Sequence, residues 1–115
     1  MQKLYKDLLQ NYIEMLDIHI DCKQTDMPFH EITEEFYEKL FEIAHEIGER
    51  HVDDGGRTRD DSVQDQKQKA ASLLSDTVQK LESSLENDDL SEEGRKMVED
   101  YLDQAKQMQQ KAQDL

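Results

Sequence analysis

The chain has 115 residues, of which 35% are hydrophobic and 37% are charged, and its net charge is −14. These values leave room for one domain with a thin core, so we expect partner subunits to bury part of its apolar surface. The acidity disfavours nucleic acid and anionic membranes as partners. The single cysteine excludes an intramolecular disulfide, and no segment reaches the ~18 apolar residues of a membrane span. We therefore expect a cytoplasmic protein.

The composition favours an all-α protein, because Leu, Glu, Gln and Lys are abundant while Val and Ile are scarce. A first helix is predicted from about Gln2 to Asp21, since its apolar residues recur every three or four positions. They form one face: Leu4, Leu8, Tyr12, Met15, Leu16 and His19. The short connector CKQTDMP follows, and its Pro28 can occupy the first turn of the next helix.

A second helix is predicted from about Pro28 to Val52, and it ends where Gly55 and Gly56 can adopt the left-handed conformation. Its core stripe consists of Phe29, Ile32, Phe36, Leu40, Ile43 and Ile47. This regular stripe indicates that one side of the helix packs inside the domain.

Two further helices are predicted after the loop DDGGRTRDDS. The third begins near Ser62, with Asp61 or Ser62 as its cap, and the fourth begins at a capping box from Asp89 to Glu92, with Ser91 as an alternative cap. Their apolar faces are Ala70, Leu74, Val78, Leu81 and Leu85, and then Val98, Tyr101, Leu102, Ala105, Met108, Ala112 and Leu115. Four amphipathic segments with short connections predict an antiparallel four-helix bundle that spans residues 1–115 as a single domain.

The second helix also carries a His-x-x-x-Glu pair twice, at His30/Glu34 and His45/Glu49. On a helical wheel the four residues share one stripe about 100° wide, well away from the core stripe. Tyr37, Phe41, Ala44 and Gly48 lie along the same side. A surface helix rarely places such residues on a second face, so we predict that they form a dimer interface.

The two pairs cannot hold one metal ion within a single chain, because fifteen residues of helix span roughly 22 Å at ~1.5 Å per residue. An antiparallel second copy would instead set His30/Glu34 of one chain opposite His45/Glu49 of the other, twice per two-fold dimer. His19 can join His30 and Glu34 if the connector folds the first helix back. Imidazole with carboxylate suits iron, zinc or manganese. A single helical histidine is nevertheless more often structural than a ligand, so incidental histidines stay an open alternative.

The segment from His19 to Gly56 resembles the Dps mini-ferritins, a ferritin-like family of iron-oxidising proteins. The resemblance is carried by His19, His30-Glu31, Glu34, Phe36, Leu40, His45, Glu49-Arg50, Val52 and Gly55-Gly56. It implies a metal site made of His19, His30 and Glu34 from one subunit with His45 and Glu49 from the next. It also implies Fe(II) oxidation by peroxide or oxygen, iron storage, and assembly of the two-fold dimer into a dodecameric shell.

The chain departs from the family pattern at two of these ligands. His45 replaces a carboxylate, and Glu34 stands where Asp is usual. The extra imidazole makes zinc plausible and puts ferroxidase activity in question. Two other functions therefore stay open: a non-catalytic metal-binding module, for example for zinc, and a helical assembly or interaction module. The acidic chain starts directly in a helix, so we expect no DNA binding.

Overall fold

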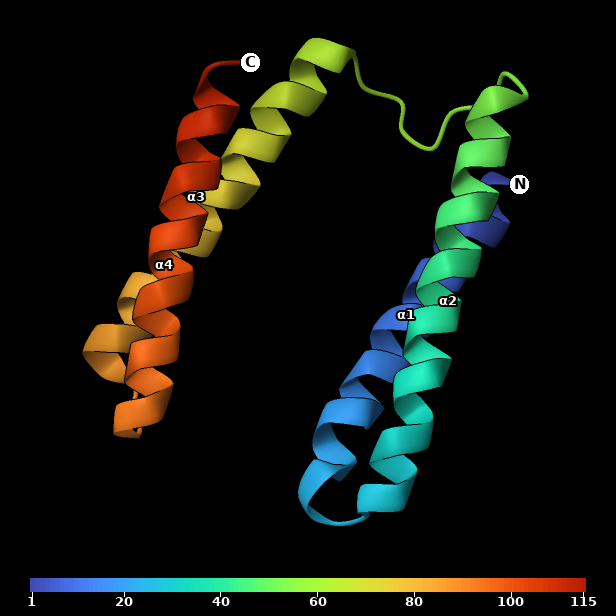
Figure 1. Ribbon diagram of the computed structural model, residues 1–115. Helices are drawn as coiled ribbons and strands as arrows, with labels where there is room; N and C mark the ends of the chain where they lie inside the picture. The colour runs from blue at the N-terminus through green and yellow to red at the C-terminus, as the bar shows by residue number, and fades with distance from the viewer. The chain divides into compact units, whose positions relative to one another are not determined.

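The computed structural model describes residues 1–115 and contains only helices, which confirms the all-α prediction (Figure 1). The elements are α1 (Gln2–Asp21), the 3-10 helix η1 (Cys22–Gln24), α2 (Met27–Asp53), α3 (Val63–Asn87) and α4 (Glu92–Gln113). They form two compact units, Met1–Asp60 and Asp61–Leu115. Each unit is a hairpin of two helices lying side by side, α1 with α2 and α3 with α4.

Three helices begin at a residue whose side chain caps the first turn, and Ser62 and Ser91 are among the caps predicted from the sequence. Asp26 accepts a hydrogen bond from the Phe29 N–H at 3.1 Å and caps α2, whose second residue is Pro28. Ser62 caps α3 through the Asp65 N–H at 3.1 Å. Of the two caps predicted for the last helix, Ser91 is the one used. Gly55 has a φ of 94° and ends the turn after α2, a conformation that glycine adopts without strain.

The α1–α2 hairpin is held together by a narrow seam of rings and small residues. Ala44 and Thr33 on α2 are both fully buried, at 0% exposure. Gly48 lies directly under the Tyr5 ring, because a Cβ at Gly48 would lie 2.7 Å from a ring carbon of Tyr5. Small residues on α2 thus allow the aromatic side chains of α1 to approach its backbone closely.

Most of the predicted core stripe of α2 is left uncovered by α1, and only Leu40 and Ile47 of its members are half-buried. Phe29, Ile32 and Phe36 are 43%, 50% and 45% exposed within the described structure. The helix α1 packs instead on the neighbouring face, which carries Thr33, Ala44 and Gly48. A helical wheel identifies the apolar faces of a helix but does not show which of them the neighbouring helix covers. Here α1 covers the face with small residues, because that face permits the closest approach of the two helix backbones.

The α3–α4 hairpin has a small aliphatic core. Val78, Leu102 and Ala105 are buried, and Leu81 and Leu85 pack against them. Polar contacts join the helices on both sides of this core: the Gln109 amide donates to the Ser75 hydroxyl at 2.9 Å, and the Arg95 guanidinium donates to the Leu85 carbonyl at 3.1 Å. Three members of the predicted face, Tyr101, Met108 and Leu115, are exposed.

Neither unit supplies a helix of the length and apolarity that crossing a lipid bilayer requires. Both hairpins nevertheless leave large apolar side chains uncovered, including Ile13, Phe41, Leu73 and Met97. A two-helix hairpin has room for only one buried seam, so further apolar surface is buried only through additional packing.

Candidate metal half-sites on the α1–α2 hairpin

His19 and His30 lie face to face across the end of the hairpin. The ring centroids are 3.9 Å apart and the ring planes differ by 17°. His19 ends the apolar face of α1, and His30 lies in the first turn of α2, so the tight connection through η1 brings the two rings together. The predicted fold-back of the first helix onto the second is therefore present, and it pairs His19 with His30.

Each histidine is oriented by the backbone of the other. The His19 Nδ1–H lies 2.9 Å from the His30 carbonyl oxygen, and His30 Nδ1 donates in return to the His19 carbonyl. A carbonyl oxygen only accepts, so both Nδ1 atoms must carry the hydrogen. In their neutral form both rings therefore present an Nε2 lone pair, which is the atom that binds a metal. Backbone-anchored imidazoles of this kind are typical of metal-ligating histidines.

Thr33 completes this arrangement from inside the hairpin. Its hydroxyl donates to the His30 carbonyl at 2.9 Å and lies 3.0 Å from His19 Nδ1. Because Thr33 is 0% exposed, its hydroxyl depends on these partners, and no buried side-chain polar atom is left without one. A buried hydroxyl therefore links the orientation of the two imidazoles.

Glu34 and Tyr37 flank the histidine pair on α2. Glu34 is exposed and Tyr37 is half-buried, and the Tyr37 ring lies 4.8 Å from the His19 ring. Burial raises the pKa of the Tyr37 phenol, and the Glu38 and Glu34 carboxylates raise it further. Glu34 thus lies near the same ring that contacts His19, but the described contacts do not join its carboxylate to either imidazole.

His45 and Glu49 form the second pair, three to four turns further along α2. His45 Nε2 lies 3.1 Å from a Glu49 carboxylate oxygen, and both side chains are more than half exposed, at 53% and 61%. The His45 ring also stacks against Phe41 with centroids 5.9 Å apart. The carboxylate therefore contacts the Nε2 atom through which the imidazole would bind a metal. A metal ion bound to both side chains could replace this direct contact.

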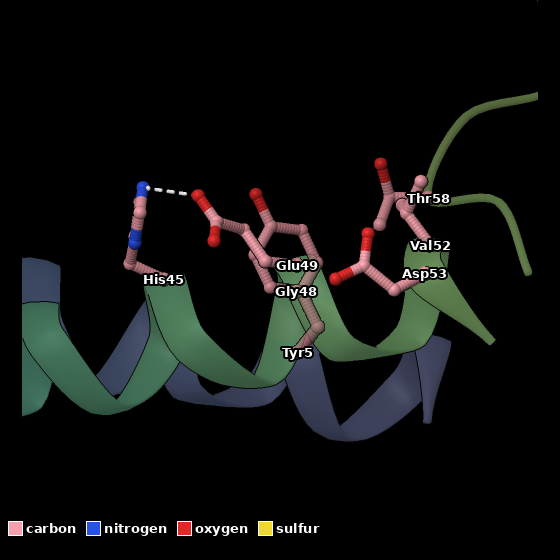
Figure 2. Close-up of a pocket in the computed structure, with 7 residues that line it drawn as sticks. All are labelled: Tyr5, His45, Gly48, Glu49, Val52, Asp53 and Thr58. Carbon is pink, nitrogen blue, oxygen red and sulfur yellow. Dashed lines mark ion pairs between the residues drawn. The ribbon is translucent and has the colours of Figure 1, made fainter.

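A pocket of about 300 Å³ opens beside this pair. Figure 2 shows the His45–Glu49 ion pair at one end, Gly48 and the Tyr5 ring in the middle, and Asp53 and Thr58 at the other end. All of its lining residues belong to the α1–α2 unit. The exposed second pair is thus accessible from solvent through an acidic hollow.

One chain does not assemble a complete metal site. No group of three or more His, Cys, Asp or Glu side chains lies in a geometry that would hold an ion. The chain instead supplies two incomplete sets, the imidazoles of His19 and His30 and the His45–Glu49 pair, separated by roughly 22 Å of helix at ~1.5 Å per residue. Imidazole nitrogen and carboxylate oxygen are ligands that fit iron(II), zinc or manganese once the two sets are combined.

The predicted dimer-interface residues divide into two groups. Ala44 is 0% exposed and Gly48 is buried under Tyr5, so both face α1 of the same chain and cannot contact a second copy as predicted. Tyr37 also contacts α1, through the rings of His19 and Tyr12. Phe41 is 51% exposed and remains the member of the set that a partner chain can reach.

Residues that sequence reasoning did not assign also shape the site. Tyr12 contacts both Tyr37 and Phe41, at centroid distances of 6.5 and 5.5 Å. Tyr5, Tyr12 and His19 are spaced seven residues apart, which places them on one helical face. Tyr12 and His19 belong to the apolar face predicted for the first helix, and the seven-residue spacing is the signal that would have added Tyr5 to it.

Comparison of the chain with protein-family models, with curated proteins and with solved structures found no match in any of the three.

Proposed function

We propose that this protein is an iron-binding, mini-ferritin-like homo-oligomer that binds Fe(II) between subunits, oxidises it and stores the product. The metal ligands in this proposal are His19, His30 and Glu34 of one subunit with His45 and Glu49 of another. The observation that carries it is the stacked pair of His19 and His30, whose Nδ1 atoms are both committed to backbone carbonyls. Such anchoring leaves the Nε2 lone pair of each neutral ring free of these hydrogen bonds and available for an ion.

A two-fold homodimer follows from the separation of the half-sites. Two copies of α2 crossing antiparallel near Lys39–Leu40 would place each His19/His30 pair beside the partner's second pair, so both sites would be completed at once. Phe41 lies near the middle of this contact and is half exposed. Contact through Phe41 and the flanking exposed side chains would replace the predicted contact through Ala44 and Gly48.

The proposal includes a ferritin-like, antiparallel four-helix bundle as the subunit. Both hairpins expose apolar side chains, with Phe29, Ile32 and Phe36 on α2 and Leu73, Met97 and Met108 on α3 and α4. Burying these side chains against one another would add the core that either hairpin lacks alone. Assembly of dimers into a larger shell would then enclose part of the acidic surface.

The chemistry assigned to the site is one-electron oxidation of bound Fe(II) by hydrogen peroxide or oxygen. The imidazoles would fix the ion, and the Glu34 and Glu49 carboxylates would favour the more highly charged Fe(III) product. The net charge of −14 would draw cations toward the protein, and the pocket beside Glu49 provides a route to the second pair.

A second function is favoured by the ligand set itself. Three imidazoles and two carboxylates are also a suitable ligand set for Zn(II), an ion that has no redox chemistry. In this alternative the same dimer would hold zinc as a structural, non-catalytic module. Measuring the bound metal by elemental analysis, and Fe(II) oxidation by absorbance, separates the two.

A complementation experiment tests the shared site. His30→Ala and Glu49→Ala should each abolish rapid Fe(II) oxidation, whereas Glu35→Ala, an exposed acid outside the stripe, should not. Mixed dimers of the two variants would carry one doubly disabled site and one intact site, so mixing should restore activity that neither variant has alone. Failure of mixing to restore activity would contradict an intersubunit site, and oxidation that survives both substitutions would contradict the ligand assignment.

A further inference from the structure

The pocket of about 300 Å³ on the α1–α2 hairpin is built from three segments of one chain. Helix α2 supplies five of its lining residues, α1 supplies Tyr5, and the loop after α2 supplies Thr58. That loop is fastened to α1 by Gln2, whose side-chain amide donates to the Thr58 carbonyl at 3.3 Å. It is fastened to α2 by His51, whose Nε2 lies 3.1 Å from the Arg57 carbonyl oxygen. The hollow therefore exists within a single chain and needs no second copy to complete it.

Two carboxylates give this pocket a negative charge. Glu49 and Asp53 both line it and lie four residues apart on α2, so their Cβ atoms are separated by about 5–6 Å on one side of the helix. Figure 2 shows the Tyr5 ring between these two side chains. No lysine or arginine lines the pocket, and its one imidazole, His45, contacts only Glu49 of the two acids. The lining therefore favours a ligand that carries positive charge.

The Tyr5 ring adds a second surface that attracts cations. The face of an aromatic ring is electron-rich, and a cation within about 6 Å of the ring centroid is drawn to it. An ammonium group of the chain itself already lies over this ring, because Lys6 Nζ is 5.6 Å from its centroid. Lys6 does not line the pocket and so does not fill it. The ring thus contacts the same kind of group that the two carboxylates would bind.

We propose that this pocket binds a short aliphatic diamine, with one ammonium group at Glu49 and the other at Asp53. The nitrogens of a four-carbon diamine are about as far apart as side chains four residues apart on a helix. Its methylene chain would lie against the Tyr5 ring and Val52, which also line the pocket. A lysine side chain from another protein has one ammonium group and would leave one carboxylate unpaired. This inference goes beyond the proposed function, because all lining residues belong to one chain and no metal takes part.

The two carboxylates are open to solvent, so each ion pair should contribute modestly. An ion pair between exposed groups strengthens binding by up to about fivefold. Putrescine makes two such pairs in the proposed site. Butylamine has the same carbon chain but a single ammonium group, and it reproduces the lysine side chain. Putrescine should therefore bind severalfold more tightly than butylamine, and the difference should shrink as sodium chloride is raised.

Titration of the isotope-labelled full-length chain, followed by NMR, measures both affinities and shows where each amine binds. The protein is first freed of metal with a chelator, because Glu49 is also a proposed metal ligand. Addition of putrescine should shift the backbone amide signals of Gly48, Val52 and Thr58. Equal affinities for putrescine and butylamine in the wild type would overturn the diamine site and indicate recognition of a single ammonium group.

A pair of double variants separates the pocket from the general acidity of the protein. Glu49→Gln with Asp53→Asn removes both charges of the pocket and nearly keeps the side-chain shapes. Glu31→Gln with Glu35→Gln removes an equally spaced pair of exposed acids on α2 that do not line the pocket. Both double variants have the same net charge, so nonspecific attraction of cations is equal in the two. The pocket variant should lose the preference for putrescine and the control should keep it, whereas an equal loss in both would overturn the proposal.

Discussion

The two hairpins of this protein have similar helices but very different interiors. The seam between α1 and α2 contains two histidines, three tyrosines and a buried threonine. Side-chain-to-backbone hydrogen bonds join the histidines and the threonine. The seam between α3 and α4 contains Val78, Leu102 and Ala105 and has no histidine. All the candidate metal ligands thus lie in the first hairpin, and under the proposed function the second would serve as a scaffold.

The two seams differ in what their side chains require. Polar and aromatic groups at the α1–α2 seam need fixed partners, because an unsatisfied buried donor is costly. Aliphatic residues at the α3–α4 seam only need to exclude water. A substitution in one hairpin should therefore affect ligand binding, while a substitution in the other should affect stability alone.

The largest effect is expected from Leu102→Ala in the scaffold hairpin. Leu102 is 9% exposed and lies in the core with Val78 and Ala105. Its truncation should lower the free energy of unfolding by about 2–5 kcal/mol, measured by urea denaturation. Amide exchange should accelerate most in α3 and α4, and the Fe(II) affinity of the protein that remains folded should not change. A large loss of affinity without loss of stability would break the proposed division of roles.

The sequence predicted much of the local structure of both hairpins. The bounds expected for the first two helices agree closely with those observed, and Ser62 and Ser91 act as caps because their hydroxyls satisfy backbone donors within three residues. Such local rules depend only on neighbouring residues. The pairing of His19 with His30 was also foreseeable, because a short connector leaves the ends of two helices adjacent.

The sequence did not determine which apolar face of α2 the first helix would cover. Phe29, Ile32 and Phe36 make the stronger hydrophobic stripe, yet α1 packs on Ala44 and Gly48. Close approach of helices depends on the shape of the contact, here the Tyr5 ring over Gly48, and hydrophobicity patterns do not encode shape. The intersubunit part of the site depends on a second chain, so its assignment stays a prediction.

Gly48→Ala tests whether close approach holds the first hairpin together. The new Cβ would lie 2.7 Å from the Tyr5 ring, so the ring must move. We expect a loss of about 1–3 kcal/mol in the free energy of unfolding, as for other overpacked sites. Gly94→Ala in α4 is the comparison, because its Cβ would approach the Ser91 hydroxyl at 3.1 Å rather than a packed ring. Equal stability of the two variants would contradict the tight α1–α2 seam.

Thr33→Val tests whether the Thr33 hydroxyl orients the His19 and His30 rings, and it does so without removing a candidate ligand. The substitution nearly keeps the shape of the side chain but deletes the hydroxyl that contacts His19 Nδ1 and the His30 carbonyl. Partners that orient metal ligands typically contribute roughly 10-fold to 100-fold in affinity, and we expect a loss near the lower value. Titration with Fe(II) or Zn(II) by calorimetry measures it. Thr77→Val in α3, which removes a hydroxyl bonded to the Leu73 carbonyl at 2.8 Å, should leave the affinity unchanged.

The smallest effect concerns alkaline stability and Tyr37. Burial and the Glu38 and Glu34 carboxylates raise the pKa of this phenol in the folded protein, so the folded state favours the neutral ring. The stabilisation is complete below the ordinary pKa of about 10 and is lost as pH rises through the higher folded value. Tyr37→Phe removes this ionisation, so its alkaline unfolding midpoint, followed by circular dichroism, should lie at higher pH than that of the wild type. An unchanged or lower midpoint would show that ionisation of Tyr37 does not oppose folding of the first hairpin.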